Sequence, residues 1–278
     1  MNWRATQNPD GGWAYGRGCS WTEPTVFALL AQSVTGVDRD SFAGGLKFLR
    51  SVAGPDGGYR PQLRVEESTW VTSAVALLPE EATGEELAGR AIGWLKGQTG
   101  RESSWSYRLR QRFAGNKDEF PEGWPWFPGA AAWVIPTSLG ILAFERALRR
   151  KDDSGVRERI DAGREFLLKH MCADGGWNHG SNQALGRDGE SYPETTGVAL
   201  LALHGLNKSG SPNTQIERAK AAARTHLRAC RTAEGIAWLS MALAVHGEKV
   251  QREFEPVRRT SMDYALMALA SAERNPLL

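Results

Sequence analysis

A short sequence recurs along the chain, in which Asp-Gly-Gly and an aromatic residue precede an apolar run. The complete copies are Asp10–Trp13, Asp56–Tyr59 and Asp174–Trp177, and a degenerate copy ends at Trp105. A repeated unit of this size cannot bury its apolar face alone and needs its neighbours to do so. The repeats therefore predict an array of similar units.

The spacing of the aromatic residues is regular. Trp13 and Tyr59 are 59 − 13 = 46 residues apart, and Tyr59 and Trp105 are 105 − 59 = 46 apart. Trp105 and Trp177 are 177 − 105 = 72 apart, which exceeds the period by 72 − 46 = 26 residues. The excess predicts an insertion at about 106–129, where Pro and aromatic residues are frequent.

Two kinds of helix alternate between the repeats. One kind is apolar around most of its surface, which is typical of an inner layer, and the other has a single apolar stripe, which is typical of an outer layer. No segment has a convincing strand pattern. The predicted helices cover residues 24–34, 41–52, 67–78, 85–96, 129–149, 156–170, 194–206, 214–230, 233–245 and 261–273.

This alternation predicts an all-α fold, an α/α toroid of five to six helical hairpins that forms one domain over residues 1–278. Residues 1–7 fit only the last turn of an outer helix. We therefore expect the helix at 261–273 to pack against the first repeat and close the ring; otherwise a partner chain or a second copy would cover that flank.

Composition argues against several classes of partner and site, namely nucleic acid, disulfides, a Cys-x-x-Cys metal site and a membrane span. The net charge of +2 and the absence of a basic block give no reason to expect nucleic acid. Cys19, Cys172 and Cys230 are far apart and odd in number, which argues against disulfides and against a Cys-x-x-Cys metal site. No apolar run approaches the ~18 residues of a membrane span. The expectation is a cytoplasmic protein without a metal or cofactor.

The units Leu49–Tyr59, Trp94–Trp105 and Phe166–Trp177 resemble the QW repeats of squalene-hopene cyclases and protein prenyltransferase β subunits. The resemblance implies an α/α barrel whose central cavity binds an apolar, isoprenoid-type small molecule or lipid, with acid/base-catalysed cyclisation as the reaction. The Asp-x-Asp-Asp motif of the cyclases and the Asp-x-Cys zinc motif of the transferases are absent from this sequence.

Three glutamates, Glu23, Glu67 and Glu194, each stand two residues before a threonine at the start of a predicted inner helix. In one interpretation they only stabilise helix N-termini. In the other they line one rim of the cavity, where a partly desolvated carboxyl group has a raised pKa and acts as an acid or base. Asp263 has the same two interpretations, and His179 is either at this rim or solvated in a loop.

Aromatic residues cluster near the starts of the inner helices and in the insertion. They either line a ligand cavity or stack on the Gly-rich loops. Within the insertion, Arg108, Arg110 and Arg112 form a basic entry, and the aromatic tip is either a lid or an ordered surface loop. The candidate substrate-binding residues are Trp21, Trp70, Trp124, Trp126, Phe127, Trp133 and Tyr192.

Three functions remain open from the sequence. The first is a terpenoid-cyclase-like or prenyltransferase-like protein. The second is a noncatalytic binding or interaction protein, and the third is a polysaccharide-active toroid with paired carboxylates and aromatic platforms in an open cleft. A closed apolar cavity would favour the first function, a core filled with side chains the second, and an open polar site the third.

Overall fold

The structure is a computed structural model. It describes residues 1–80, 84–104, 107, 109, 113, 121–180, 183–184, 187–209, 213–248, 250 and 255–278. The inner helices are α2 (Thr22–Thr35), α4 (Val71–Ala76), α8 (Val134–Leu148), α10 (Pro193–Ala202), α12 (Ala233–Val245) and α13 (Ser261–Ala270). The outer elements are α1 (Trp3–Thr6), α3 (Arg39–Ser51), α6 (Glu85–Lys96), α9 (Ser154–Lys169) and α11 (Thr214–Ala229).

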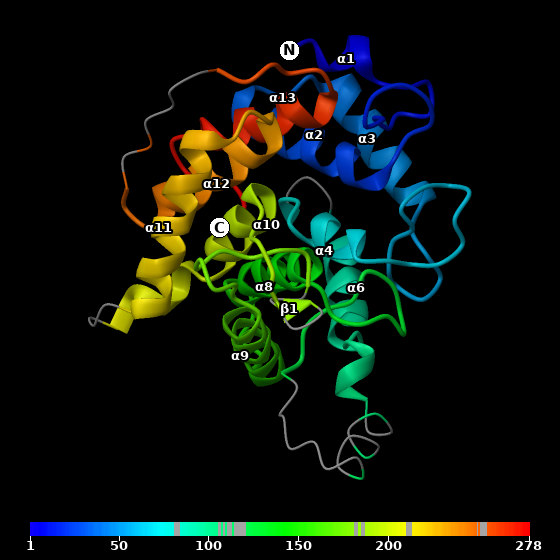
Figure 1. The fold of residues 1–278 in the computed structure, drawn as a ribbon. Helices are drawn as coiled ribbons and strands as arrows, with labels where there is room; N and C mark the ends of the chain where they lie inside the picture. Colours follow the sequence, from blue (N-terminus) through cyan, green and yellow to red (C-terminus); the bar gives the residue numbers. More distant parts are fainter. Residues whose placement is uncertain are drawn as a thin grey trace.

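In the described part of the chain, the inner helices form a closed ring. Each packs against the next in the order α2, α4, α8, α10, α12 and α13, and α13 packs against α2. Helices α3, α6, α9 and α11 lie outside this ring (Figure 1). The predicted all-α fold, an α/α toroid, is confirmed.

The two layers follow from the two apolar patterns. Every residue of α2 from Pro24 to Gln32 is buried, whereas α3 buries mainly one stripe that includes Phe48 and Leu49. A helix that is apolar on all sides must be enclosed, whereas a one-striped helix can face solvent. Contiguous apolar burial at roughly 25 cal/mol per Å² stabilises the ring.

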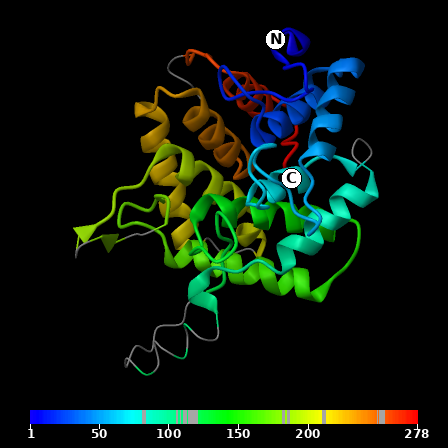
Figure 2. The same cartoon turned by 90° about the vertical axis from the view of Figure 1, so that its right-hand side faces the viewer.

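Most predicted helix limits hold to within a few residues, and those at 85–96 and 233–245 match α6 and α12. The prediction for 67–78 starts too early, because Thr69 N donates to Tyr59 O (2.9 Å) and the chain is still extended there. The sequence also predicts no strands, but the structure contains one short pair. Gln183–Ala184 (β1) and Arg187–Asp188 (β2) pair antiparallel and project from the helical body (Figure 2).

Helix α13 closes the ring against the first repeat, as the sequence predicts. Besides the α13–α2 packing, Ser261 Oγ donates a hydrogen bond to Ala14 O (2.8 Å). The segment after α13 continues to the opposite end of the ring, where Leu277 is fully buried and Arg146 Nη1 donates to Pro276 O (2.9 Å). That end of the ring is therefore covered by the chain itself.

The aromatic residue of each repeat is fixed by one recurring contact, in which its backbone N–H donates to a threonine Oγ1 on the next inner helix. The pairs are Trp13–Thr25 (2.9 Å), Tyr59–Thr72 (2.8 Å), Trp124–Thr137 (2.9 Å) and Trp177–Thr196 (3.0 Å). Two sequence assignments are therefore wrong. Thr72 takes the place assigned to Thr69, and Trp124 takes the place assigned to Trp105, which lies outside the described residues.

This correction moves the insertion. Trp124 Nε1 donates to Leu95 O at the end of α6 (3.0 Å), as Trp177 Nε1 donates to Leu167 O at the end of α9 (2.6 Å). The first link spans 124 − 95 = 29 residues and the second 177 − 167 = 10, so the extra residues precede Trp124. From Trp124 to Thr137 the repeat has ordinary length.

Each complete Asp-Gly-Gly turn is built in the same way. Asp10 Oδ1 accepts hydrogen bonds from Gly12 N (3.0 Å) and Ser20 Oγ (2.6 Å). The intervening Gly11 has φ of 91°, which L side chains rarely adopt, and a Cβ there would lie 2.2 Å from Gly44 O. The turn thereby ties each loop to its outer helix and fixes where the next inner helix starts.

Candidate functional site

The inner helices begin at one end of the ring, which we call the mouth. Three of the aromatic loops cover the start of the preceding inner helix, because a loop carbonyl accepts a free backbone N–H of that helix start. Thr22 N donates to Pro61 O (2.8 Å), Trp70 N to Trp126 O (3.0 Å) and Val134 N to His179 O (2.9 Å). Side chains in the first turns of the inner helices are thereby gathered at the rim of the mouth.

Four carboxylates, one each on α2, α10, α12 and α13, occupy first-turn positions on one side of the mouth. Glu23, Glu194 and Glu234 are each the second residue of their helix, and Asp263 is the third residue of α13. The sequence analysis identified three of these and missed Glu234. Like Glu23, Glu234 stands two residues after the N-cap of an inner helix, Thr232 here and Trp21 for Glu23.

Glu23 has the most perturbed surroundings among the acids predicted from the sequence. Burial, together with the negative charge of Glu234, raises its pKa from 4.5 to about 7, although a hydrogen bond from Tyr15 opposes the shift. In turn, burial and the charge of Glu23 raise the pKa of Tyr15 above its usual value. At neutral pH the Glu23 carboxyl group is therefore divided between its protonated and ionised forms, with Tyr15 as a fixed donor.

Glu234 is the second perturbed acid. Burial, with smaller contributions from the negative charges of Glu194 and Asp263, raises its pKa from 4.5 to about 7. The negative charge of Glu234 thus opposes ionisation of Glu23, and the charges of Glu194 and Asp263 oppose ionisation of Glu234. Two carboxyl groups that hold or release protons near neutral pH are suited to general acid and base roles.

The floor beneath these two acids is made of side chains. Phe27 and Trp238 stand one helical turn after Glu23 and Glu234, and their rings meet edge to face with centroids 5.8 Å apart. Phe27 is fully buried and Trp238 is 5% exposed. Below the rim, α2 and α12 thus contact each other through aromatic rings, and the acids lie above a closed apolar floor.

The other predicted acids have simpler roles. Asp263 Oδ2 accepts hydrogen bonds from Arg259 N (2.8 Å) and Thr260 N (2.9 Å) in a capping box, so its helix-capping interpretation holds. Glu194 Oε1 accepts from Thr232 Oγ1 (3.1 Å), which links α10 to the start of α12. Glu67 is exposed, precedes α4 and is not among the charges that shift the pKa of Glu23 or Glu234, so its role as a rim acid stays a prediction.

Aromatic side chains follow the opposite side of the mouth, over α4 and α8. Trp126 packs edge to face against Trp70 (centroids 4.8 Å apart) and lies 6.5 Å from Trp133. All three are partly buried, so each retains some surface for a ligand. We call Trp70, Trp126 and Trp133 the aromatic run.

Two further aromatic pairs join the aromatic run to the acids. Tyr192, at the start of α10, lies 5.4 Å from the His179 ring, and Trp21, at the start of α2, lies 5.7 Å from the Tyr15 ring. Phe127 is 50% exposed. Trp21 and Tyr192 lie at the starts of inner helices, and His179 is exposed in its loop beside Tyr192. Contact of these residues with a substrate stays a prediction.

Trp124 is not a substrate-binding residue. It is 2% exposed, its ring packs edge to face against Phe144 (5.2 Å), and the Arg159 guanidinium lies over it at 4.1 Å. Trp124 therefore cannot form part of the predicted lid, because its ring is buried beneath the loop and anchors it. Arg108, Arg110 and Arg112 lie outside the described residues.

Among the described residues, no group of three or more His, Cys, Asp and Glu side chains is arranged to hold a metal ion. No helix in the described ranges is both long and apolar enough to cross a membrane.

The fold, but not the sequence, is similar to known proteins. No family model matches the sequence, and no curated protein matches it. Endoglucanase Cel10, a family 8 glycosyl hydrolase from Klebsiella pneumoniae, is similar with a TM-score of 0.60 and 13% identity over 96% of both chains.

Two other solved structures extend this comparison. A GH76 α-mannanase from Bacteroides thetaiotaomicron has a TM-score of 0.62 and 10% identity, over 91% of this chain and 85% of that one. The type II terpene cyclase MstE from Scytonema has a TM-score of 0.55 and 15% identity, over 96% of this chain and 73% of that one. At these identities the similarity establishes the α/α-toroid fold, which glycoside hydrolases and a terpene cyclase share.

Proposed function

We propose that the protein cleaves glycosidic bonds in a polysaccharide or oligosaccharide bound across the mouth of the ring. The observation that carries this proposal is the pair Glu23 and Glu234, two carboxyl groups in the first turns of α2 and α12 whose pKa values are raised to about 7. Glycoside hydrolysis needs one protonated carboxyl group to donate to the leaving oxygen and one ionised group to act as base or nucleophile. A coupled pair supplies both forms near neutral pH.

The aromatic run supports the same substrate class. Pyranose rings present apolar C–H faces, and partly exposed Trp side chains offer large flat surfaces for them. A chain resting on Trp70, Trp126 and Trp133 would extend toward the acids on the other side of the mouth. The similar structures named as an endoglucanase and an α-mannanase add support at the level of the fold.

The isoprenoid substrate implied by the sequence resemblance has less support. A carboxyl group with a pKa near 7 is a weak acid, suited to a glycosidic oxygen and poorly suited to protonating an alkene. In addition, Phe27 and Trp238 meet directly beneath Glu23 and Glu234, where an apolar substrate would need an open cavity. The fold similarity to a terpene cyclase keeps this reaction as the alternative.

The test is an assay of reducing ends released from soluble β-glucan, mannan, xylan and chitosan, followed by variants on the substrate that is cleaved. Glu23→Gln and Glu234→Gln should each lower kcat by about 10²- to 10⁴-fold, because each removes a proton donor or acceptor at nearly constant shape. Glu67→Gln is the matched control, since Glu67 is an exposed acid outside the cluster. Cleavage that survives both rim substitutions would contradict the proposal.

A further inference from the structure

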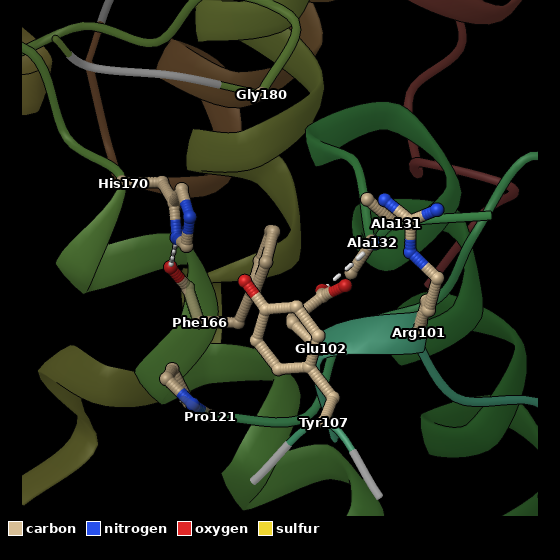
Figure 3. Close-up of a pocket in the computed structure, with 9 residues that line it drawn as sticks. All are labelled: Arg101, Glu102, Tyr107, Pro121, Ala131, Ala132, Phe166, His170 and Gly180. Atoms are coloured by element: carbon tan, nitrogen blue, oxygen red, sulfur yellow. Dashed lines mark hydrogen bonds between the residues drawn. The ribbon is translucent and has the colours of Figure 1, made fainter. Parts of the chain in front are cut away.

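A hollow lies outside the ring, against the outer helix α9. It has a volume of about 230 Å³ and is formed by η1 (Arg101–Ser103), the loop before α8 and the C-terminal end of α9. Figure 3 shows Glu102 between Tyr107 and Arg101, with His170 and Phe166 across the pocket. None of these residues takes part in the acid cluster or the aromatic run.

Glu102 uses only half of its hydrogen-bonding capacity within the protein. Its Oε1 accepts a hydrogen bond from Ala132 N (2.9 Å), which holds the loop just before Trp133. Its Oε2 is buried and has no partner among the described residues. A buried carboxylate oxygen without a donor is costly, so this site favours a molecule that brings a donor to it.

His170 presents a second acceptor to the same pocket. Its ring is stacked on Phe166 (centroids 3.9 Å apart), and its Nδ1 lies 2.7 Å from Phe166 O. Burial lowers the pKa of His170, which favours the neutral imidazole. In the neutral form the contact to a carbonyl requires hydrogen on Nδ1, so Nε2 is left as an acceptor.

The charges of the pocket oppose each other. Glu102 carries a negative charge and Arg101 a positive one, and the Arg101 side chain is exposed and forms no ion pair among the described residues. A small cation would be attracted by Glu102 and repelled by Arg101, and the reverse holds for an anion. A neutral molecule with several donors and acceptors avoids both penalties and satisfies all three groups.

We propose that this pocket binds one neutral, hydroxyl-rich ring, such as a single pyranose unit. Its hydroxyl groups donate to Glu102 Oε2 and His170 Nε2, and Arg101 donates to one of its oxygens. The volume of the pocket fits a molecule of that size and not a long chain. The binding site is separate from Glu23 and Glu234, and the inference does not require that those acids cleave anything.

The test is a titration of the full chain with methyl β-D-glucoside and methyl α-D-mannoside, followed by saturation-transfer NMR and by the amide shifts of Ala132 and Gly180. We expect saturation transfer and saturable shifts with at least one glycoside. Glu102→Gln should raise Kd by about tenfold or more, because it removes a charged acceptor while keeping an oxygen for Ala132 N. Ala131→Leu, which fills the pocket without altering its charges, should abolish binding.

Glu165→Gln is the control, because Glu165 is an exposed acid on α9, the helix that ends at His170, and its substitution should leave Kd unchanged. Glu23→Gln should also leave Kd unchanged, which separates this inference from the proposed hydrolysis. Three results would overturn it: no shifts at Ala132 and Gly180 with either glycoside, a Kd in Glu102→Gln within twofold of the wild-type value, or tighter binding of methylammonium than of the glycosides. Thermal unfolding of each variant establishes that it is folded.

Discussion

The two sides of the mouth are built on the same helical hairpins and carry different chemistry. On the side of α2, α10, α12 and α13, first-turn residues are acids, and burial raises the pKa of two of them to about 7. On the side of α4 and α8, the corresponding surface consists of Trp70, Trp126 and Trp133. Repetition thus fixes the backbone, whereas the first turn of each inner helix is free to differ.

The two sides of the mouth are also stabilised by different contacts. Glu194 accepts a hydrogen bond from Thr232, and Asp263 is fixed by its own capping box, so the acidic side is organised by polar contacts between helix starts. The aromatic run rests on a loop that is anchored from below by Trp124. We therefore expect substitutions on the two sides to affect different measurements.

The largest expected effect concerns the anchor of the aromatic side. Trp124→Ala should lower the free energy of unfolding by about 3 to 5 kcal/mol, because it removes a buried ring and its hydrogen bond to Leu95 O. Trp126→Ala, at a partly buried position in the same loop, should cost about 1 kcal/mol. Urea unfolding of both variants is the measurement, and equal costs would show that Trp124 is not the anchor.

The roles of the helices could be predicted from the sequence, but the role of Trp124 as the anchor of its loop could not. The inner and outer helices were predictable from apolar periodicity, and the packing of α13 against α2 agrees with the expected closure of the ring. The third repeat was misassigned to Trp105 because a spacing of 46 residues fits twice in succession. The register of a repeat is set by the contact of the aromatic N–H with a threonine, and that contact is visible only in three dimensions.

The candidate site was predictable in part for a related reason. Glu23 and Glu194 are recognisable as first-turn acids, but the same pattern includes Glu67, which is exposed. Glu23 differs from Glu67 in its neighbours, because Tyr15 and Glu234 lie beside Glu23 and shift its pKa. Tyr15 comes from a loop, and no periodic pattern in the sequence connects it with α2.

The next effect is a pH dependence of stability that belongs to the acidic side alone. Both glutamates have a pKa raised from 4.5 to about 7 in the folded state, so the unfolded state releases these protons at lower pH. Stability should therefore fall as pH rises from about 5 to 8, by up to about 3 kcal/mol for each independent group. Glu23→Gln should reduce this slope, and Trp70→Ala should not. Thermal unfolding at fixed ionic strength measures it, and an unchanged slope in Glu23→Gln would refute the assignment.

A smaller effect is expected from the aromatic side on a cleaved polysaccharide. Trp70→Ala should raise KM by about tenfold, or about 1.4 kcal/mol, and leave kcat nearly constant, because it removes binding surface remote from the reacting bond. The Glu23 and Glu234 variants should show the opposite division. Steady-state kinetics on a soluble substrate distinguishes the effect on KM from the effect on kcat. A loss of kcat in Trp70→Ala at constant KM would contradict the proposal that the aromatic side binds substrate and the acidic side catalyses.

The smallest effect tests Tyr15. Its hydroxyl donates to the Glu23 carboxylate and thereby lowers the pKa of that group against the effects of burial and of Glu234. Tyr15→Phe removes the donor and keeps the ring beside Trp21, so the Glu23 pKa should rise by up to about one unit, the equivalent of a single hydrogen bond. In the pH profile of kcat/KM, the limb set by Glu23 should move to higher pH, and the limb set by Glu234 should move less.

The direction of this shift holds whether Glu23 acts as acid or as base, since either role depends on the same ionisation. An acid would give a shifted alkaline limb, and a base would give a shifted acid limb. Tyr264→Phe is the matched control, because it removes a hydroxyl group from a ring on α13 that lies beneath Arg258 and not against Glu23. A profile that moves equally in both variants, or toward lower pH in Tyr15→Phe, would show that Tyr15 does not set the proton affinity of Glu23. A shift confined to one limb would identify the role of Glu23 from the limb that moves.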